Sequence, residues 1–445
     1  MKTKYIITLL ILVGSFVNMF AQTEEETPYK KRVLENTEVD FLTSAYYQDG
    51  ENAAAGGGIG SEKILDGTGA IVVAVPMNAD DILKVDASVS AYTSASSSNI
   101  NPFDSDRANP YVASSGASSN DVWVNLTTSY THSSDDRNQI TSGKFSVSNE
   151  FDYFSLGFGG SYSRLFNEKN TELSVHGSVY LDQWKLIYPV ELRDSNSERE
   201  GYNPNNITGT GTYQPNFTSI DSKARNSYSV GFGFSQILSK KLQSSLALDL
   251  VQQNGLLSTP FHRIYFSDKN DFFVKDFQLA DDIERLPSTR NKIAAGLRLN
   301  YYINEIFVLR SYYRYYTDSW GIKSNTASLE IPIKISPKFT IYTAYRYYNQ
   351  TAVNYFAGYE QHLSTEEYYT SDYDLSKFHA HQYTLGMSYT DIFTEKHLWK
   401  FAIKSIDVKI NKYNRDSSFK SYMITAGIKF ILDEPLNIPF LNKKN

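Results

Sequence analysis

The chain has 445 residues and a formal net charge of −6, with 34 tyrosines and 26 phenylalanines. It has no basic tract, so nucleic-acid binding lacks electrostatic support. It has no cysteine, which excludes disulfides, thiolate metal sites and cysteine nucleophiles. The tyrosine content is larger than a protein core needs and suits a membrane–water interface, where the ring is buried and the hydroxyl stays hydrated.

The N-terminus has the pattern of a secretory signal. Lys2 and Lys4 precede an apolar run over residues 5–17, and Ala21 precedes Gln22. This predicts a signal peptide over 1–21. The alternative is a short membrane anchor, but the run is short and the acidic stretch 23–26 follows it. Residues 22–37 are then expected to form a short periplasmic segment.

Alternating apolar and polar residues follow, most clearly over 153–164. Phe154, Leu156, Phe158 and Tyr162 share one face, whereas glycines and serines occupy the other. Small polar residues facing a lumen and apolar residues facing lipid are typical of a transmembrane β-barrel. A soluble two-sheet protein is the alternative, and it would bury the apolar face between its sheets.

The same alternation recurs along the chain. Further strands are expected at 83–91, 122–130, 173–181, 228–234, 242–250, 293–301, 307–315, 329–335, 341–347, 383–389 and 422–430. Weaker patterns occur at 39–47, 70–75, 140–148 and 401–410. The last changes phase between Ile403 and Ile406, as a β-bulge would, and Pro332 is expected to mark another bulge. The total is about sixteen strands, or about fourteen if the weak ones fail.

The connections alternate between short and long. Tight turns are indicated at 78–81, 167–170, 239–241, 304–305 and 336–338. Long connections are expected at 48–67, 95–120, 185–225, 254–289 and 350–381, with two short outer loops at 150–152 and 318–321. This predicts an all-β, antiparallel up-and-down transmembrane barrel over 38–432 in the outer membrane of a Gram-negative bacterium, with both termini and a tail over 433–445 in the periplasm. The mean hydropathy of −0.40 fits, because only alternate residues face lipid.

Three segments have the most distinctive sequence: 254–263, 312–323 and 368–376. With 115–118 and 133–137, they resemble a family of Gram-negative outer-membrane proteins described only as a domain of unknown function. The resemblance extends over almost the whole mature chain and implies the barrel and its location, but no catalytic or ligand residues. Some members are encoded near a flavin transferase, a thioredoxin-fold protein and a small lipoprotein, which implies a redox or cofactor-export setting.

The alternation also predicts which charged side chains face the lumen. The expected charge cluster consists of Arg298, Arg310, Arg314, Arg346, Glu330, Lys334 and Asp249, and Lys84, Asp86 and His176 should also point inward. Arginines in a lumen would favour anionic solutes. The alternative, which the sequence favours, is that they pair with Asp249 and Glu330 and hold the shape of the barrel.

The loop 350–381 holds a group of carboxylates, Glu366, Glu367, Asp372 and Asp374, interleaved with tyrosines. Oxygen ligands suit calcium, although the spacing matches no complete calcium loop, and a solvated surface loop is favoured. The mixture would also suit a carbohydrate or protein partner. His379 and His381 share one strand face and could bind a transition metal with His362.

Loop 254–289 contains further acidic residues, expected to be surface charge: Asp268, Asp271, Asp276, Asp281, Asp282 and Glu284. His262 beside Ser258 and Thr259 is the nearest approach to a hydrolase arrangement. No nucleophile elbow is present, so the sequence does not predict an enzyme.

The sequence therefore predicts a pore or transporter for a small solute, with no resident cofactor apart from the calcium site above. The alternative is a barrel that scaffolds a small lipoprotein or a surface or redox partner, and an outer-membrane enzyme is less favoured. Expected partners are outer-membrane lipids and the barrel-assembly machinery, with no nucleic acid. At about sixteen strands side chains alone do not fill a lumen. The tract 52–60, rich in Ala and Gly, is too small to plug it.

Overall fold

A computed structural model describes residues 31–93, 120–193, 204–221 and 223–432. The expected signal peptide (1–21), the C-terminal tail (433–445), most of the segment 22–37 and most of the long loop 95–120 lie outside these residues. Among the described residues, no helix combines the length and apolar character needed to cross a bilayer.

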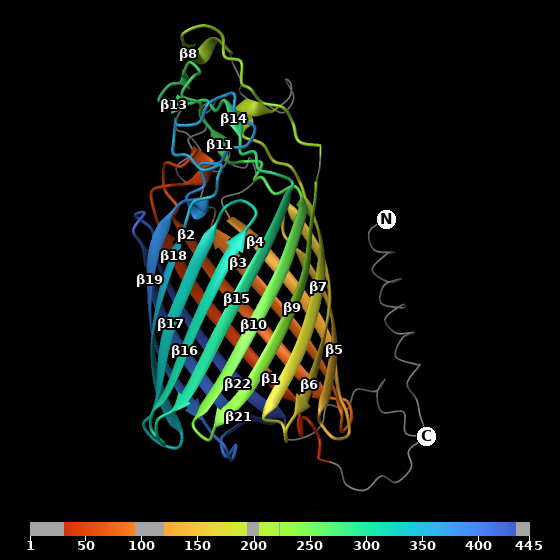
Figure 1. Ribbon diagram of the computed structural model, residues 1–445. Helices are drawn as coiled ribbons and strands as arrows, with labels where there is room; N and C mark the ends of the chain where they lie inside the picture. The colour runs from red at the N-terminus through yellow and green to blue at the C-terminus, as the bar shows by residue number, and fades with distance from the viewer. Residues whose placement is uncertain (1–30, 94–119, 194–203, 222, 433–445) are drawn as a thin grey trace.

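Sixteen antiparallel strands form one closed wall (Figure 1). Each strand pairs with its neighbours in chain order, and β22 pairs with β1 from Glu38↔Ile431 to Asp49↔Lys420, which closes the barrel. The two-residue strand β20 (His397–Leu398) only extends the sheet at a turn. The wall strands are β1 (Glu38–Asp49), β2 (Ile64–Pro76), β3 (Asp81–Thr93), β4 (Asn120–Ser133), β5 (Gln139–Asn149), β6 (Tyr153–Phe166), β7 (Thr171–Trp184), β9 (Ala224–Ser239), β10 (Leu242–Gly255), β15 (Thr289–Tyr302), β16 (Val308–Asp318), β17 (Lys323–Lys334), β18 (Phe339–Gln350), β19 (Phe378–Thr390), β21 (Phe401–Arg415) and β22 (Lys420–Leu432).

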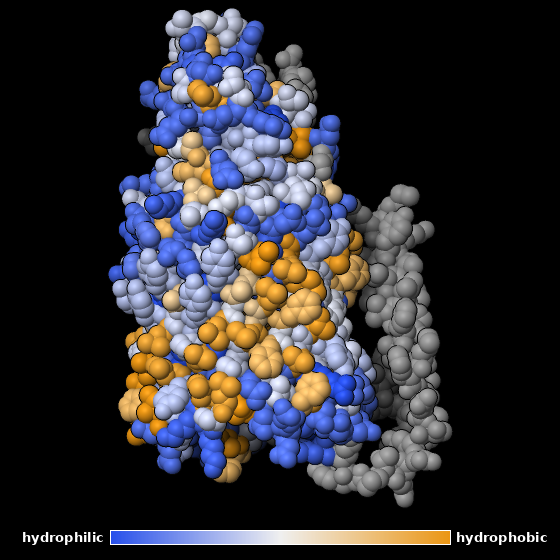
Figure 2. Space-filling view, in the orientation of Figure 1, coloured by the Kyte–Doolittle hydropathy of each residue, from blue (hydrophilic) through white to orange (hydrophobic). Residues whose placement is uncertain are grey.

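The outer surface of the wall is apolar. Leu246, Leu385 and Ile424 are 51%, 56% and 50% exposed, although each lies in the middle of a strand. In Figure 2 hydrophobic residues gather over the wall, and hydrophilic residues cover the loop end above and the turn end below. A closed wall has no unpaired edge, so its strands can pair their backbone hydrogen-bonding groups with one another, which hydrocarbon requires. The barrel is therefore a transmembrane barrel, as predicted.

The expected strands are confirmed, including the weak ones, which are β1, β2, β5 and β21. The expected bulge is also present, because the register between β21 and β22 shifts between Ile403 and Ser405. The expected bulge at Pro332 is wrong. Pro332 pairs with Tyr342 without a register shift. On its other side the continuous ladder to β16 ends at Glu330, and a bridge between Phe307 and Ile333 continues in the same register. Proline lacks the N–H group, so the strand loses a hydrogen bond rather than gaining a residue.

The long loops fold together at one end of the barrel (Figure 1). We call the described parts of loops 50–63, 185–223, 256–288 and 351–377, with the short loop 319–322, the cap. It contains η2 (Ala54–Gly56), η4 (Val190–Leu192), η5 (Pro204–Asn206), β8 (Ile207–Gly209), β11 (Arg263–Ile264), β12 (Phe272–Val274), β13 (Phe277–Gln278), β14 (Asp282–Ile283) and η6 (Tyr373–Leu375). Four small apolar clusters hold the cap together, one of which joins Leu257, Leu286, Trp320, Ile322 and Val353. The two short outer loops, at 150–152 and 319–322, are as expected.

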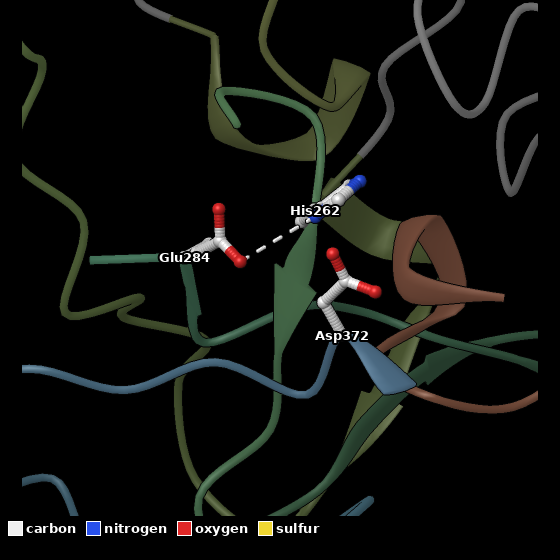
Figure 3. Close-up of side chains that lie close together, drawn as sticks. All are labelled: His262, Glu284 and Asp372. Carbon is white, nitrogen blue, oxygen red and sulfur yellow. Dashed lines mark ion pairs between the residues drawn. The ribbon is translucent and has the colours of Figure 1, made fainter. Parts of the chain in front are cut away.

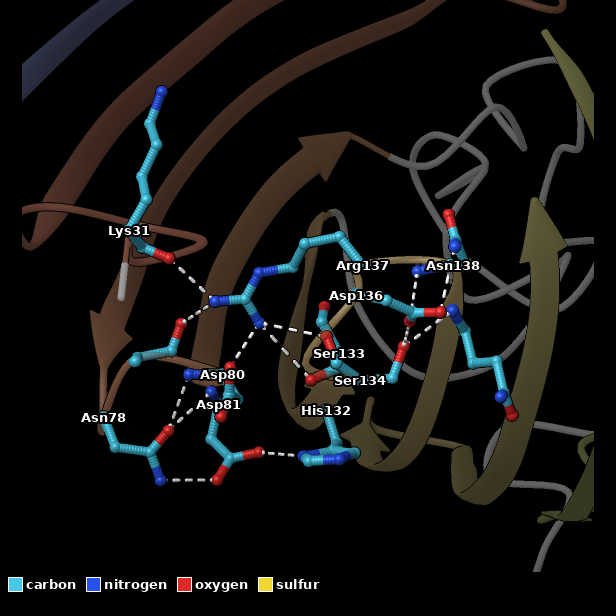
Figure 4. A network of polar contacts seen from close by, with 12 residues as sticks. Lys31, Asn78, Asp80, Asp81, His132, Ser133, Ser134, Asp136, Arg137 and Asn138 are labelled. Carbon is cyan, nitrogen blue, oxygen red and sulfur yellow. Dashed lines mark hydrogen bonds and ion pairs between the residues drawn. The ribbon is translucent and has the colours of Figure 1, made fainter. Parts of the chain in front are cut away.

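The other end of the barrel carries the tight turns, and the described start of the chain lies against them (Figure 4). Arg137, in the turn after β4, donates hydrogen bonds to the carbonyl oxygens of Lys31 and Ala79 at 2.8 and 2.9 Å and pairs with Asp80. Leu432 N donates to Thr37 O at 2.9 Å. Both ends of the wall sequence therefore lie at the turn end.

Candidate functional site

The bore of the barrel is accessible to water. Arg310 on β16 and Glu330 on β17 are direct neighbours, and Arg310 Nη1 donates to Glu330 Oε1 at 2.8 Å. Both alternate with outward apolar residues and so point inward, yet their side chains are 55% and 33% exposed. Inward side chains can be this exposed only where the bore is not filled by neighbouring side chains.

The predicted arginines form a patch on the bore wall rather than a contact cluster. Arg298, Tyr312, Ser328 and Arg346 lie directly opposite one another on four successive strands, so Arg298 and Arg346 are about 15 Å apart along the wall. The Arg298 guanidinium lies 5.5 Å from the centre of the Tyr312 ring. Lys334 lies farther toward the turn end, about 13 Å from Glu330 along β17.

Asp249 does not join this patch, so its expected pairing with the arginines is wrong. Its Oδ1 atom instead lies 3.4 Å from Nε2 of His176. Asp249 is on β10 and His176 is on β7, with Gly231 of β9 between them. The two side chains reach across Gly231, where a Cβ atom would collide with both. Arg310–Glu330 is the expected structural pair that does form.

The inward charges of the described wall are unevenly distributed around the bore. On β15 to β22 they are mostly basic: Arg290, Lys292, Arg298, Arg310, Arg314, Lys334, Arg346, Lys409, Arg415 and Lys429, against Asp318, Glu330 and Asp407. On β1 to β10 they are mostly acidic: Glu38, Asp40, Asp66, Asp86, Asp121, Glu172, Asp182 and Asp249, against Lys84, Lys144 and Arg225. The alternation of each strand could have identified these residues, and the predicted up-and-down order could have placed them in two opposed halves.

Some of the inward charges are paired with a neighbour of opposite sign, in both halves of the wall. Glu38 and Asp40 lie 3.1 and 3.4 Å from Lys429 Nζ, in addition to the pairs of Glu330 and Asp249 described above. Within the described residues, Arg314 and Arg346 form no ion pair, and both are exposed to the bore. The bore therefore presents uncompensated positive charge on one side.

The four carboxylates expected to hold calcium do not come together. Glu366 Oε2 lies 2.8 Å from His362 Nδ1, and Asp374 Oδ1 lies 2.5 Å from Arg415 Nη1. The Glu367 carboxylate accepts a hydrogen bond from the Tyr368 hydroxyl, which raises the pKa of that tyrosine. Asp372 lies near His262 instead. Because each carboxylate has its own local partner, the four do not form one ligand set.

The expected histidine group also separates. His379 and His381 are on the outward face of β19, and their Nδ1 atoms lie 2.9 and 2.8 Å from the hydroxyls of Tyr347 and Tyr345. His362 is buried in the cap, where its Nε2 atom lies 3.1 Å from Thr370 O.

His262, Glu284 and Asp372 do come together, in the cap (Figure 3). Pairing of β11 with β14 places His262 opposite Glu284, and Glu284 N donates to His262 O at 2.9 Å. Asp372 arrives from loop 351–377, which joins β14 through the reciprocal backbone bonds of Arg285 and Tyr369. The sequence did not predict this group, and its interpretation of Asp282 and Glu284 as surface charge is wrong, since they are 0% and 2% exposed.

Burial and mutual contact shift the protonation of this group. Burial, and then the nearby Asp374 carboxylate, raise the pKa of Asp372 to about 7. Burial disfavours the charged His262 ring, but Glu284 and Asp372 outweigh that effect, so its pKa is raised. Burial also disfavours the charged Glu284, but contact with His262, Thr370 and Thr259 lowers its pKa. Ser258 takes no part in this arrangement, since its Oγ atom accepts a hydrogen bond from Leu286 N at 2.8 Å.

The closed wall, apolar outside and charged within, defines a transmembrane β-barrel of the outer-membrane type. More particularly, the chain belongs to the family described as "Protein of unknown function (DUF3570)", whose model matches residues 7–424. This confirms the resemblance seen in the sequence. No curated protein matches the chain.

Several solved structures share the barrel fold. A bacterial polysaccharide outer membrane secretin has a TM-score of 0.46 at 8% identity, over 89% of this chain and 98% of its own. OccK1 (OpdK) of Pseudomonas aeruginosa has a TM-score of 0.37 at 7% identity, over 90% and 99%. OccAB3 of Acinetobacter baumannii has a TM-score of 0.38 at 9% identity, over 89% and 99%. At such identities and TM-scores the similarity carries no argument about function.

Proposed function

We propose that this protein is an outer-membrane channel for small anionic solutes. The observation that carries the proposal is the water-accessible bore with Arg314 and Arg346 unpaired on one side. Facing acidic strands make the two halves of the bore opposite in sign. Such an arrangement draws the negative end of a solute toward the basic wall, because low-dielectric walls focus the field of fixed charges.

The basic half of the bore favours anions over cations. Glu330, which lies in this half, is paired with Arg310, so its charge is partly neutralised before a solute arrives. Arg314 and Arg346 form no such pair within the described wall, and so their charge remains available to a passing anion. The same patch would slow cations by repulsion.

Single-channel recording tests the proposal. Refolded mature protein in a planar bilayer under a KCl gradient should conduct. Its reversal potential should lie closer to the equilibrium potential of Cl⁻ than to that of K⁺. Arg314→Gln combined with Arg346→Gln should move the reversal potential toward the equilibrium potential of K⁺. Lys240→Gln, in the tight turn between β9 and β10, removes a charge outside the bore and should leave selectivity unchanged.

A second candidate function is a scaffold for a surface partner. The cap favours it, because its four apolar clusters make it a folded unit at the outer end of the barrel. If correctly folded protein in the bilayer does not conduct, the channel proposal fails. Cross-linking in native membranes would then be expected to capture a lipoprotein or a surface protein on the cap.

A further inference from the structure

The His262 ring in the cap has an unsatisfied polar atom. Its Nδ1 atom is buried and has no hydrogen-bond partner within the described residues. It lies 3.6 Å from Glu284 Oε1, which is too long for a hydrogen bond. A buried donor or acceptor without a partner costs folding free energy, so native proteins rarely keep one unless something else occupies the site.

Glu284 is held in a fixed orientation beside this atom. Its Oε2 atom accepts a hydrogen bond from Thr259 N at 2.7 Å, and its Oε1 atom accepts one from the Thr370 hydroxyl at 2.5 Å. These two bonds come from different loops, 256–288 and 351–377. Secondary contacts of this kind orient a metal-binding carboxylate and raise its affinity.

Asp372 completes the group. One oxygen or nitrogen ligand atom from each of His262, Glu284 and Asp372 lies within 4.8 Å of the other two. The Asp372 Oδ1 atom also accepts a hydrogen bond from Asp374 N at 2.8 Å, at the start of η6. Two carboxylates this close repel each other when both are ionised, and a cation between them would remove the repulsion.

We propose that His262, Glu284 and Asp372 bind a divalent transition-metal ion, for which Zn²⁺ is the best match. One imidazole nitrogen and two carboxylate oxygens suit zinc, whereas calcium and magnesium prefer sites made of oxygen ligands alone. Three protein ligands leave one position of a tetrahedral site for water. The side chain of His262 is 17% exposed, so the site has contact with solvent.

The distances are compatible with such an ion after a small movement. Tetrahedral ligands about 2.0–2.1 Å from zinc lie about 3.3 Å from one another. The His262–Glu284 separation of 3.6 Å is already close to this value. Asp372, beside the short helix η6, has a carboxylate oxygen within 4.8 Å of both ligand atoms. The ion would then join loops 256–288 and 351–377 in addition to their hydrogen bonds.

Zinc titration tests the site. The full-length mature protein in detergent, without a polyhistidine tag and after removal of metal by EDTA, should bind one equivalent of Zn²⁺. Co²⁺ in its place should give the visible absorption of a tetrahedral N/O site. His262→Gln and Asp372→Asn should each abolish binding. Thr370→Val, which removes the hydrogen bond to Glu284, should weaken Zn²⁺ binding about 10- to 100-fold.

His379→Gln is the matched control, because it removes a histidine from the outer face of β19 and should leave Zn²⁺ binding unchanged. Heat-modifiable migration on a gel checks that each variant retains its barrel. The proposal is overturned if the wild-type protein binds no Zn²⁺, or if His262→Gln binds it with unchanged affinity. The readout needs no conduction, so failure of the channel proposal would leave this test valid.

Discussion

Arg263 and Glu191 form an ion pair with no solvent contact in the centre of the cap. Arg263 Nε donates to Glu191 Oε1 at 2.6 Å and Nη2 donates to Oε2 at 3.2 Å, and both side chains are 0% exposed. Arg263 Nη1 also donates to Ala55 O at 2.9 Å. One side chain therefore joins loop 256–288 to loop 185–223 and to the Ala- and Gly-rich tract 52–60. The tract is therefore part of the cap, and its Asn52 Nδ2 atom also donates to Ser417 O at 2.8 Å.

Glu191→Ala should destabilise the cap by about 3–5 kcal/mol, because it leaves the buried Arg263 charge without its carboxylate. This pair lies in the cap and not in the barrel wall, so the wall should keep its structure. Proteolysis of the intact protein should therefore cut the cap loops faster, while the heat-modifiable barrel remains. Glu395→Ala is the control: it removes an exposed carboxylate that pairs with Lys338 at the turn end, and should change neither measurement. If the protease cut the cap loops of both variants at the same rate, the prediction would be wrong.

Gly255, at the end of β10, should not tolerate a side chain. Its φ of +110° lies in the region that favours glycine, and a Cβ atom would collide with the backbone oxygen of Ala224. Gly255→Ala should lower the stability of the folded barrel by about 1–3 kcal/mol through backbone strain. Urea unfolding in detergent, followed by the loss of β-sheet circular dichroism, measures this change.

Gly143→Ala provides the comparison for Gly255. It adds the same methyl group on the outer face of β5, where a Cβ atom would meet nothing within 4 Å. Its urea midpoint should match the wild-type protein or rise slightly. If both variants shift the midpoint equally, the left-handed conformation of Gly255 does not matter for stability.

Arg137 should hold the start of the chain against the turn end. It pairs with Asp80 and donates to the carbonyl oxygens of Ala79 and Lys31, so one guanidinium joins its own turn to the turn between β2 and β3 and to the start of the chain. Arg137→Gln should release the segment 31–37, and trypsin should then cleave after Lys31 and Arg32 several times faster than in the wild-type protein. Lys169→Gln, in the turn between β6 and β7, is the control and should not change cleavage at these sites. An unchanged cleavage rate in Arg137→Gln would show that other contacts hold the segment.

The barrel could be predicted from the sequence because its pattern is local. Alternation along each strand determines which residues face lipid. For this reason the sequence also indicated the change of phase at Ile403. The Arg310–Glu330 pair followed for the same reason, since consecutive strands are neighbours in the wall. Asp249 was misplaced because the sequence does not reveal that His176, two strands away, reaches it across Gly231.

The cap could not be predicted, because its contacts join segments that are distant in the chain. Arg263 and Glu191 are separated by 72 residues, and Thr370 and Glu284 by 86. Its loops show no regular apolar period, so nothing local indicates that Glu284 is buried. The same acidic residues were therefore interpreted as surface charge. Only a sign that loops 256–288 and 351–377 pack together would have revealed the His262 group.

The stability of the cap should fall as the pH rises from about 4 to about 7. Burial raises the pKa of Asp281 from an ordinary 3.8 to about 6, and that of Asp372 from 3.8 to about 7. A raised pKa means that the folded cap binds the proton more tightly than the unfolded chain does. This stabilisation is complete below pH 4 and is lost as the pH passes through the raised values. The pKa of His262 is also raised, so this residue likewise lowers the stability of the cap as the pH rises, but at higher pH. The pKa of Glu284 is lowered, so its contribution to stability has the opposite pH dependence, which is confined to pH values below about 4.5.

Asp281→Asn should flatten the fall in stability between pH 4 and pH 6, because the amide stays neutral at every pH. Urea unfolding of the cap can be followed by the fluorescence of Trp320, which is 3% exposed in the cap, in a background where the other three tryptophans are replaced by Phe. EDTA should be present throughout, so that bound metal does not contribute. Asp276→Asn, a substitution in the same loop, should keep the wild-type pH dependence. A cap that becomes more stable between pH 5 and pH 7 would contradict the direction assigned to Asp281 and Asp372.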